Sequence, residues 1–264
     1  MNAVRPLAVV TGASSGIGLA LARQFADKGF DLVVCAEDRG LAAAAQELRG
    51  HGADVVAVRA DLATYDGVEQ LYAAVLSARR PVAAAALNAG VGRGGAFLGV
   101  DLADHARIID LNINATVHLT HRLLRGMVEE DDGRLLITSS VAAMAPGPYQ
   151  TVYSASKSFL QSFAQGLQGE LRDTGVSVTS LMPGATETAF FHRAGMDDTR
   201  LGRMDKDDPA RVAEDAFEAL MRGRDKVVAG SVRTKVLGAA AKVLPDRLKA
   251  AGQRYVSRPR PRRQ

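Results

Sequence analysis

Short apolar runs alternate along this chain with segments in which apolar residues recur every three to four positions. The runs are continuous rather than alternating, which is typical of strands buried on both faces of a sheet. The pattern predicts strands at Leu7–Thr11, Asp31–Ala36, Asp54–Arg59, Val82–Asn88, Arg134–Ser139 and Val176–Met182, and a short last strand at Val227–Ala229.

The segments between the runs have the 3.6-residue period of amphipathic helices. Helices are predicted at Ile17–Lys28, Arg39–His51, Val68–Arg79 and Ala103–Glu129, and from the segment containing Tyr153 to about Arg172. Asp208-Pro209 predicts one more helix start, since Asp caps helices and Pro suits the first turn. Strands that alternate with helices predict an α/β fold, a single-domain Rossmann-like doubly wound parallel sheet with helices on both faces.

No Pro/Ser-rich linker interrupts the first 185 residues, so residues 1–230 are predicted to form one domain. Residues 186–208 are polar and irregular and follow the carboxyl end of a strand. Ligands bind at that edge of a parallel sheet, so this segment is predicted to be a substrate lid. Residues 231–264 are predicted to form a basic C-terminal helix and a disordered tail.

The composition, 47% hydrophobic and 23% charged over 264 residues, is that of a globular protein with a sizeable core. A single cysteine, Cys35, excludes an intrachain disulfide and a cysteine-based zinc site. The N-terminal residues do not resemble a signal peptide, and no apolar run is long enough to cross a bilayer. We therefore expect a cytoplasmic protein.

The positive charge is concentrated at the end of the chain. Ten of the 33 Lys and Arg residues but only one of the 29 Asp and Glu residues follow residue 230, so this segment carries +9 and the remainder −5. Four apolar residues there fall on one helical face: Val232, Val236, Val243 and Leu244. We expect this face to pack against the body or a partner subunit, with peripheral contact to an anionic membrane as the alternative. No nucleic-acid partner is expected.

A glycine-rich stretch, TGASSGIG at residues 11–18, lies between the first predicted strand and the first helix. Gly12 permits a tight turn, Gly16 lets the backbone approach a phosphate, and Gly18 lets the helix pack closely on the strand. The helix N-terminus would supply N–H groups and a positive dipole end to a pyrophosphate. An ordinary glycine-rich turn is the alternative interpretation.

Further motifs follow this loop in order: Asp61-Leu62, Asn88-Ala89-Gly90, Asn112, Ser139-Ser140, YSASK with Tyr153 and Lys157, and Pro183-Gly184 with Thr188. From about residue 7 to residue 188, the chain thereby resembles the short-chain dehydrogenase/reductase family. One position departs from the family pattern, because Leu87 stands where the family has the first Asn of its NNAG motif.

The resemblance implies an NAD(P)-dependent oxidoreductase that interconverts a carbonyl (ketone or aldehyde) and an alcohol by hydride transfer. Its partners would be a small-molecule substrate and copies of itself, as a homodimer or homotetramer. The catalytic residues carried over are Asn112, Ser140, Tyr153 and Lys157. The cofactor-binding residues carried over are Gly12, Ser14, Ser15, Gly16, Ile17, Gly18, Glu37, Asp61, Leu62, Asn88, Ala89, Gly90, Tyr153, Lys157, Pro183, Gly184 and Thr188.

Tyr153 and Lys157 lie four positions apart, so on a helix they share a face. A nearby ammonium favours the phenolate, and we expect it to lower the pKa of Tyr153, which would act as the general acid or base. By the resemblance, Lys157 also binds the nicotinamide ribose and Asn112 holds a water that relays protons. Ser140, thirteen residues before Tyr153, matches the family spacing for the serine that holds the substrate oxygen, with Ser139 as the alternative.

The choice between NAD and NADP depends on the residues after the second strand. NADP-preferring members of the family commonly have a basic residue just after this strand or before the second glycine of the loop. This chain has Glu37 and Ser15 at those positions. The sequence therefore slightly favours NAD, although Arg39 could turn back onto a 2′-phosphate.

Four other features of the sequence allow a second interpretation. Ser154 and Lys157 also match the S-x-x-K motif of serine β-lactamases, but the companion motifs are missing. His118 and His121 share a helical face without further ligands at suitable spacing, so no metal site is expected. The same fold could also serve regulation without turnover. Phe190-Phe191-His192 would either close over an apolar substrate or simply pack.

Overall fold

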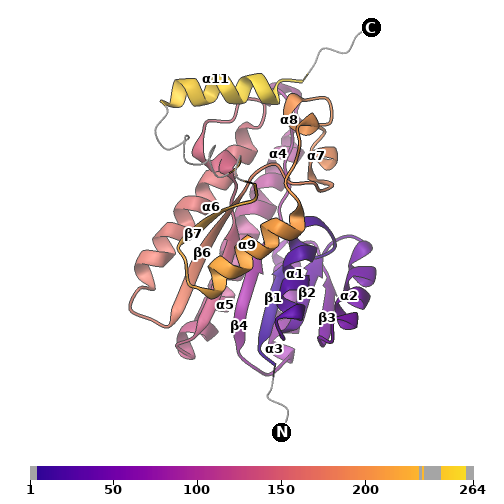
Figure 1. The fold of residues 1–264 in the computed structure, drawn as a ribbon, viewed down its shortest axis with the longest axis vertical. Helices are drawn as coiled ribbons and strands as arrows, with labels where there is room; N and C mark the ends of the chain where they lie inside the picture. The colour runs from indigo at the N-terminus through magenta and orange to yellow at the C-terminus, as the bar shows by residue number, and fades with distance from the viewer. Residues whose placement is uncertain (1–4, 232–233, 235–244, 260–264) are drawn as a thin grey trace.

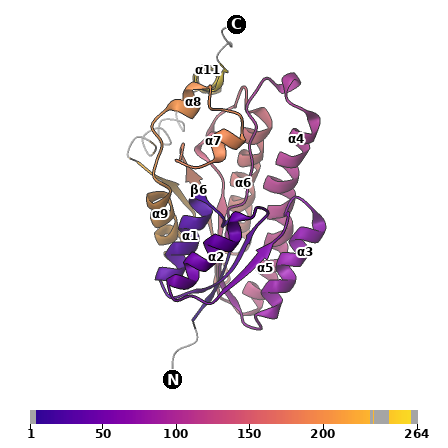
Figure 2. The same ribbon diagram turned by 90° about the vertical axis from the view of Figure 1, so that its right-hand side faces the viewer.

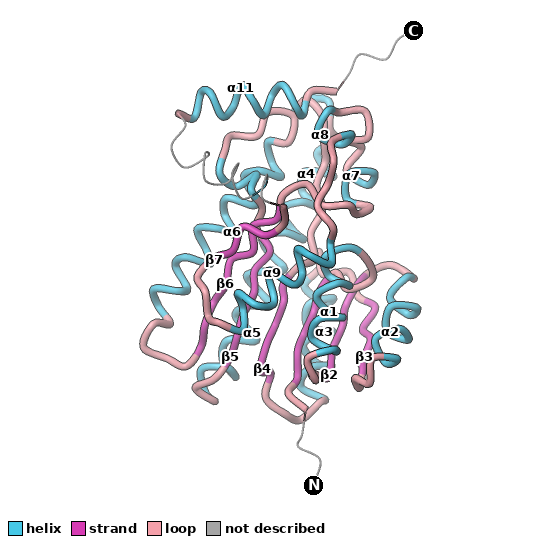
Figure 3. The backbone as a smooth tube through the Cα atoms, viewed as in Figure 1, coloured by secondary structure: helices cyan, strands magenta, loops and turns pink. Residues whose placement is uncertain are grey.

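Within the residues that the computed structural model describes (5–231, 234 and 245–259), seven strands form one parallel sheet. The strand order is β3-β2-β1-β4-β5-β6-β7, and Figures 1 and 3 show the strands side by side with helices around them. The strands are β1 Leu7–Thr11, β2 Asp31–Ala36, β3 Val55–Arg59, β4 Val82–Leu87, β5 Gly133–Thr138, β6 Val176–Pro183 and β7 Lys226–Ala229.

The order of strands reverses between β1 and β4, so the two halves of the sheet diverge from the carboxyl ends of these neighbours. Ligands bind at such a switch point in doubly wound sheets. The central strands β1 and β2 are buried at every position, which accounts for their continuous apolar sequence. In the edge strand β3, only Val55 and Val58 are buried and the other three positions are exposed.

Helices cover both faces of the sheet. In Figure 2, α1 (Gly16–Asp27), α2 (Gly40–Gly50) and α9 (Pro209–Met221) lie on one side, while α3 (Tyr65–Ser77) and α5 (Ala115–Glu129) lie on the other. Successive side chains of a strand point to opposite faces, so one strand contributes to two cores. Ala8 and Val10 belong to the first core, and Leu7 and Val9 to the second.

The fold class and all seven predicted strands are confirmed, and strand bounds differ from the predictions by one residue at most. The long helix predicted at Ala103–Glu129 is correct in extent but wrong as a single α-helix. It consists of α4 (Leu102–Ile109), a π-helical turn at Asp110–Asn114, and α5. The wider turn includes Asn112, and such π-turns are frequent at functional sites.

The lid segment contains two short helices, α7 (Phe190–Arg193) and α8 (Arg200–Arg203), and leads into α9. As predicted, Asp208 caps α9, its Oδ1 accepting from the Ala210 N–H at 2.9 Å.

Helix α11 (Asp246–Ser257) crosses the carboxyl edge of the sheet and contacts α8, as Figure 1 shows. It is fastened at one end by a 2.8 Å hydrogen bond from Gln150 Nε2 to Ser257 Oγ. At the other end, Lys249 Nζ donates to Met144 O at 3.2 Å. The apolar face expected from Val232 to Leu244 lies outside the described residues, and the division of the chain at residue 230 stays a prediction.

No helix in the described ranges is both long and apolar enough to span a lipid bilayer.

Close contact between α1 and the glycine loop gives a direct test of the packing. A Cβ placed on Gly18 would lie 2.1 Å from the Gly12 carbonyl oxygen, so Gly18→Ala should destabilise the protein by about 1–3 kcal/mol. Gly126→Ala is the matched control, because a Cβ there meets nothing within 4 Å and the helix should gain about 0.5–1 kcal/mol. Urea denaturation of both variants measures the difference, and equal effects would contradict this view of the loop.

Candidate active site

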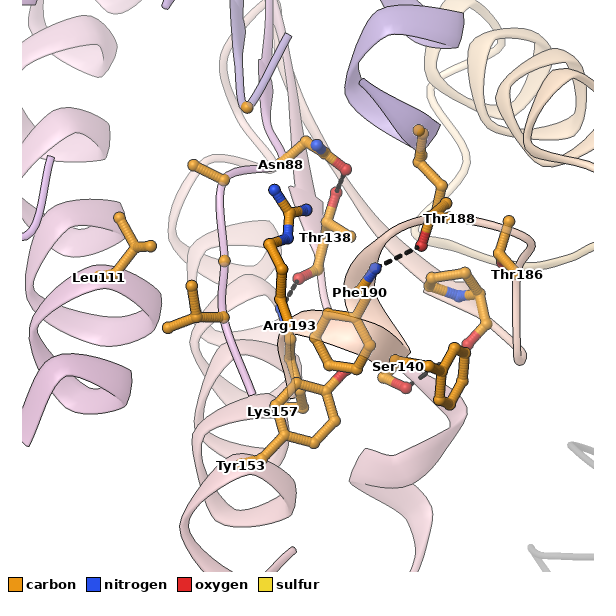
Figure 4. A pocket seen from close by; sticks show the side chains of 18 of the residues that line it. Asn88, Leu111, Thr138, Ser140, Tyr153, Lys157, Thr186, Thr188, Phe190 and Arg193 are labelled. Carbon is orange, nitrogen blue, oxygen red and sulfur yellow. Dashed lines mark hydrogen bonds between the residues drawn. The ribbon is translucent and has the colours of Figure 1, made fainter. Parts of the chain in front are cut away.

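One cavity of about 300 Å³ opens at the carboxyl edge of the sheet, at the switch point between β1 and β4 (Figure 4). Almost all the residues carried over from the family resemblance line it. These are Gly12, Ser14, Ser15, Gly16, Ile17, Glu37, Asp61, Leu62, Asn88, Ala89, Gly90, Ser140, Tyr153, Lys157, Pro183, Gly184 and Thr188. Gly18 and Asn112 do not line the cavity. Gly18 packs closely against Gly12 of the glycine loop, and Asn112 accepts a hydrogen bond from the Val91 N–H.

The glycine loop takes a conformation that requires glycine. Gly12 and Gly16 have φ of 67° and 58°, in the left-handed region. A Cβ on Gly16 would come within 2.8 Å of Thr188 Cγ2, so the two walls of the cavity approach each other here. Ser15 precedes α1 in an extended conformation without a side-chain cap, which leaves first-turn N–H groups of the helix available to an anion.

Thr11, at the end of β1, holds the start of the loop that follows β4. Its Oγ1 accepts from the N–H groups of Asn88 and Ala89 at 2.9 and 3.0 Å. The Asn88 amide in turn donates to Thr11 O at 3.3 Å. Asn88 therefore joins two strand ends as well as lining the cavity. Leu87 is 4% exposed in the second core, where an apolar side chain fits.

Tyr153 and Ser140 come together from α6 (Thr151–Glu170) and from the residues after β5. Ser140 Oγ hydrogen-bonds to the Tyr153 side chain and accepts from the Ala142 N–H at 3.1 Å. Ser139 has a different task, because its hydroxyl donates to Lys157 O at 2.8 Å and ties β5 to α6. Of the two serines, Ser140 is thus the one hydrogen-bonded to the tyrosine.

Lys157 is buried beside Tyr153, with its Nζ 5.8 Å from the centroid of the tyrosine ring. Its ammonium donates to Thr138 O at 2.8 Å. Burial lowers the pKa of Lys157 to about 8, because a low-dielectric environment disfavours the charged form.

The expectation of a lowered tyrosine pKa is wrong for the protein by itself. Burial raises the pKa of Tyr153 to about 12, and the hydrogen bond with Ser140 opposes this shift only in part. Sequence reasoning counted the neighbouring charge but could not count the burial of the phenol. At neutral pH the phenol is protonated and available as a proton donor.

Asn112 joins the π-turn to two other segments. Its Oδ1 accepts from Val91 N at 2.9 Å, and its Nδ2 donates to Val91 O at 3.0 Å and to Ser156 Oγ at 2.9 Å. Both amide protons are therefore committed, and the side chain is 0% exposed. This arrangement positions α6 and the loop after β4, whereas a water held by the side chain would have only the remaining lone pair of Oδ1.

Acidic side chains gather at the other end of the cavity. Glu37 and Asp61 both pair with Arg107 of α4, and this pairing holds the pKa of Asp61 below its usual value. Asp38, which the sequence reasoning missed, lines the cavity between Ser14 Oγ at 2.6 Å and the Gly40 N–H at 2.8 Å. Arg39 is not among the lining residues.

The lid and α11 complete the cavity with residues that the motifs did not indicate. Phe190 and Phe191 line it, and the Phe190 ring lies 5.2 Å from that of Tyr153. Gln253 reaches it from α11. His192 instead faces outward and pairs with Asp197 at 2.8 Å.

The alternative motifs find no support in the geometry. Ser154 is buried with its Oγ unpartnered, and it is not among the cavity residues, which excludes the S-x-x-K nucleophile here. His118 pairs with Glu69 at 2.6 Å. In the part of the chain that the structure describes, no three His, Cys, Asp or Glu side chains are grouped to hold a metal ion.

Comparison with known families decides how this cavity is to be understood. The family model for short chain dehydrogenases matches residues 6–198, from the first strand into the segment 186–208. The chain belongs to the short-chain dehydrogenase family.

Its relatives span nearly the whole molecule. Sulfoacetaldehyde reductase 2 of Chromohalobacter salexigens is 36% identical over 222 residues, covering 81% of this chain and 86% of the relative. A Burkholderia phymatum short chain dehydrogenase/reductase, solved with NAD, superposes with a TM-score of 0.82 at 27% identity, covering 90% and 92% of the two chains. A Sphingobium yanoikuyae short-chain dehydrogenase, solved with NADPH, gives 0.81 at 30% identity and 98% coverage of both.

The short-chain dehydrogenases are NAD(P)-dependent oxidoreductases, and this member has the residues to hold the dinucleotide. The cradle that a Cβ on Gly16 would fill lies beside the open N-terminus of α1, which suits a pyrophosphate. The polar groups at the acidic end suit the hydroxyls of a ribose. The residues present therefore fit the cofactor.

The buried lysine predicts a pH-dependent stability. Folding lowers the pKa of Lys157 from 10.5 to about 8, so the unfolded chain binds more protons between these values and stability rises with pH across that window. Lys157→Met removes this dependence. Its stability relative to wild type should be most favourable at pH 7 and fall by about 2 kcal/mol by pH 9.5.

Urea denaturation at the two pH values measures this change. Lys28→Met, at an exposed position, controls for the general loss of a positive charge. A pH-independent difference between Lys157→Met and wild type would show that the ammonium is better solvated than its burial implies.

Proposed function

We propose that this protein interconverts a small carbonyl compound and its alcohol by hydride transfer with NAD(P), using Tyr153 as the general acid or base. The observation that carries the proposal is that two sets of residues line one cavity. Ser140, Tyr153 and Lys157 form the first set, and the glycine loop forms the second. Proton transfer and cofactor binding thus share a single space.

In the reductive direction, the substrate oxygen would lie between the Ser140 hydroxyl and the Tyr153 phenol. NAD(P)H, when bound, would supply the hydride. Tyr153, protonated at neutral pH, would give its proton to the substrate oxygen, and Ser140 would hold that oxygen by a hydrogen bond. The Lys157 ammonium would stabilise the phenolate that remains and would hold the nicotinamide ribose.

Asn112 positions this group rather than reacting. It fixes Val91 and Ser156, and Ser156 Oγ also donates to Tyr153 O at 2.7 Å. The turn of α6 that carries the tyrosine is thereby held against the π-turn. A proton relay from solvent would pass behind Lys157 on this side.

Similarity to the Chromohalobacter sulfoacetaldehyde reductase supports reduction of an aldehyde. A cytoplasmic location and assembly into a homodimer or homotetramer stay predictions. Use of the fold for regulation without turnover is the competing proposal, and the intact Ser140–Tyr153–Lys157 group argues against it. Oxidation of NADH or NADPH at 340 nm in the presence of a panel of ketones and aldehydes separates the two.

Tyr153→Phe tests the proton donor. The ring is retained, so the variant should fold and bind cofactor, but kcat should fall by about 10²–10⁴-fold because general acid catalysis is lost. Stopped-flow or steady-state rates, with cofactor affinity from nucleotide fluorescence, measure the two effects. A near-normal kcat would refute the mechanism.

The neighbouring serines give a matched pair for the substrate contact. Ser140→Ala should lose most of the activity, since it removes the hydroxyl bonded to Tyr153. Ser139→Ala should cost stability through its lost bond to Lys157 O but should affect kcat less. The reverse order of kcat values would assign the role to Ser139.

We further propose a modest preference for NAD(H). Glu37 and Asp38 lie where a 2′-phosphate would approach, and the repulsion, after screening, amounts to about 1–2 kcal/mol or roughly ten-fold in Kd. Arg107 neutralises part of the Glu37 charge, which limits the effect.

Kd values for NADH and NADPH, measured for wild type, Glu37→Gln and Arg39→Ala, test this preference. Glu37→Gln should narrow the difference, and Arg39→Ala should leave it unchanged. Tighter binding of NADPH that disappears in Arg39→Ala would transfer the choice to that arginine.

A further inference from the structure

The charges that line the cavity are separated by sign. Among the described lining residues, five are charged: Glu37, Asp38, Asp61, Lys157 and Arg193. The three acids lie at the end of the cavity next to β2 and β3. The catalytic end contains only the two cations, so its electrostatic potential favours a negative group.

Arg193 differs from every other basic residue of the lid. Four of them have partners: His192 pairs with Asp197, Arg203 with Asp198, Lys206 with Glu187, and Arg200 stacks on Tyr255 at 3.6 Å. The Arg193 guanidinium has no ion pair or hydrogen bond to any described residue, and only its main-chain atoms are bonded, to Ala189 and Arg93. It is also the one basic residue of the lid that lines the cavity.

The position of Arg193 on α7 places it near the reacting groups. It follows Phe190 by three residues, so the two side chains share a helical face. Phe190 packs against Tyr153, with ring centroids 5.2 Å apart. Figure 4 shows the Phe190 and Tyr153 rings next to each other, with Arg193 beside Phe190 and its guanidinium turned toward Asn88.

We propose that the carbonyl substrate carries an anionic group, a carboxylate, sulfonate or phosphate, and that Arg193 binds it. This inference rests on the proposed function, since it names the class of substrate for the same site. A guanidinium presents two parallel N–H donors that match such oxyanions, whereas one donor of Lys157 is bonded to Thr138 O and the others are proposed to serve the phenolate and the ribose. Phe190 and Phe191 would cover the carbon chain between the anion and the carbonyl.

The same guanidinium chemistry could meet a phosphate of the cofactor instead. The two sources differ in what Arg193→Gln would impair. An anion on the substrate makes the variant lose preference for charged substrates at unchanged cofactor affinity. A cofactor phosphate makes it lose cofactor affinity and treat charged and neutral substrates alike.

The kinetic test compares matched carbonyl pairs on the full-length protein: succinic semialdehyde with its methyl ester, and acetoacetate with methyl acetoacetate. Wild type should favour the acid in kcat/KM. In Arg193→Gln this preference should fall by about 10- to 100-fold, the effect of losing a charge-assisted hydrogen bond, and Arg193→Lys should recover part of it. Arg203→Gln, which removes a lid arginine outside the cavity, is the control and should match wild type.

A binding test stands independently of turnover. Calorimetric titration of the protein with butyrate and ethanesulfonate, each against butyramide, is run with and without saturating NAD⁺. Wild type should bind the anions more tightly than the amide, and Arg193→Gln should not. NADH and NADPH affinities of the same variants are measured in parallel.

The outcomes are distinct. Loss of anion preference in Arg193→Gln at unchanged cofactor Kd supports the inference, even if neither carbonyl pair is turned over and the proposed function fails. Equal treatment of acids and neutral partners by wild type overturns the inference while leaving carbonyl reduction intact. Weaker cofactor binding in Arg193→Gln with unchanged anion preference also overturns it, and assigns the arginine to a cofactor phosphate.

Discussion

The buried ammonium of Lys157 is the constraint on which the Ser140–Tyr153 end of the cavity depends. A cation that is 4% exposed is unfavourable unless its donors are satisfied, and the Thr138 carbonyl at the end of β5 provides the acceptor. That bond fixes the end of β5 relative to α6. Ser139 reinforces it from the same strand end by donating to the Lys157 carbonyl. The pair of bonds brings Ser140 to Tyr153, so the geometry of the proton donor follows from the placement of the lysine.

The π-turn of the long helix serves the same end from the opposite side. The π-turn carries Asn112, whose amide meets both Val91 and Ser156. With all three hydrogen bonds made, the loop after β4 and the first turns of α6 become one unit. The cost of an irregular helix is offset by satisfied buried polar groups, which is the usual condition for such a turn.

The sequence predicted the sheet well because continuous apolar runs such as Leu7–Thr11 have few alternatives to a buried strand. It also identified the residues of the cavity wall whose spacing is local, such as Gly12 to Ile17 or Tyr153 with Lys157. It could not predict contacts between distant segments. Arg107 is 70 positions from Glu37, and Gln253 is 100 positions from Tyr153, so no local pattern relates them. The predicted direction of the Tyr153 pKa shift was wrong for the same reason, since the burial of a side chain depends on the whole fold.

Two arginines near the cavity differ in whether the protein supplies an acid to pair with them. Arg107 forms ion pairs with Glu37 and Asp61, so its charge is neutralised within the protein. The same pairing weakens the repulsion of the two acids toward a phosphate. The Arg193 guanidinium has no acidic partner among the described residues, and it lines the cavity. On the proposals made above, selectivity at the two ends of the cavity depends on which cations the protein neutralises with its own carboxylates.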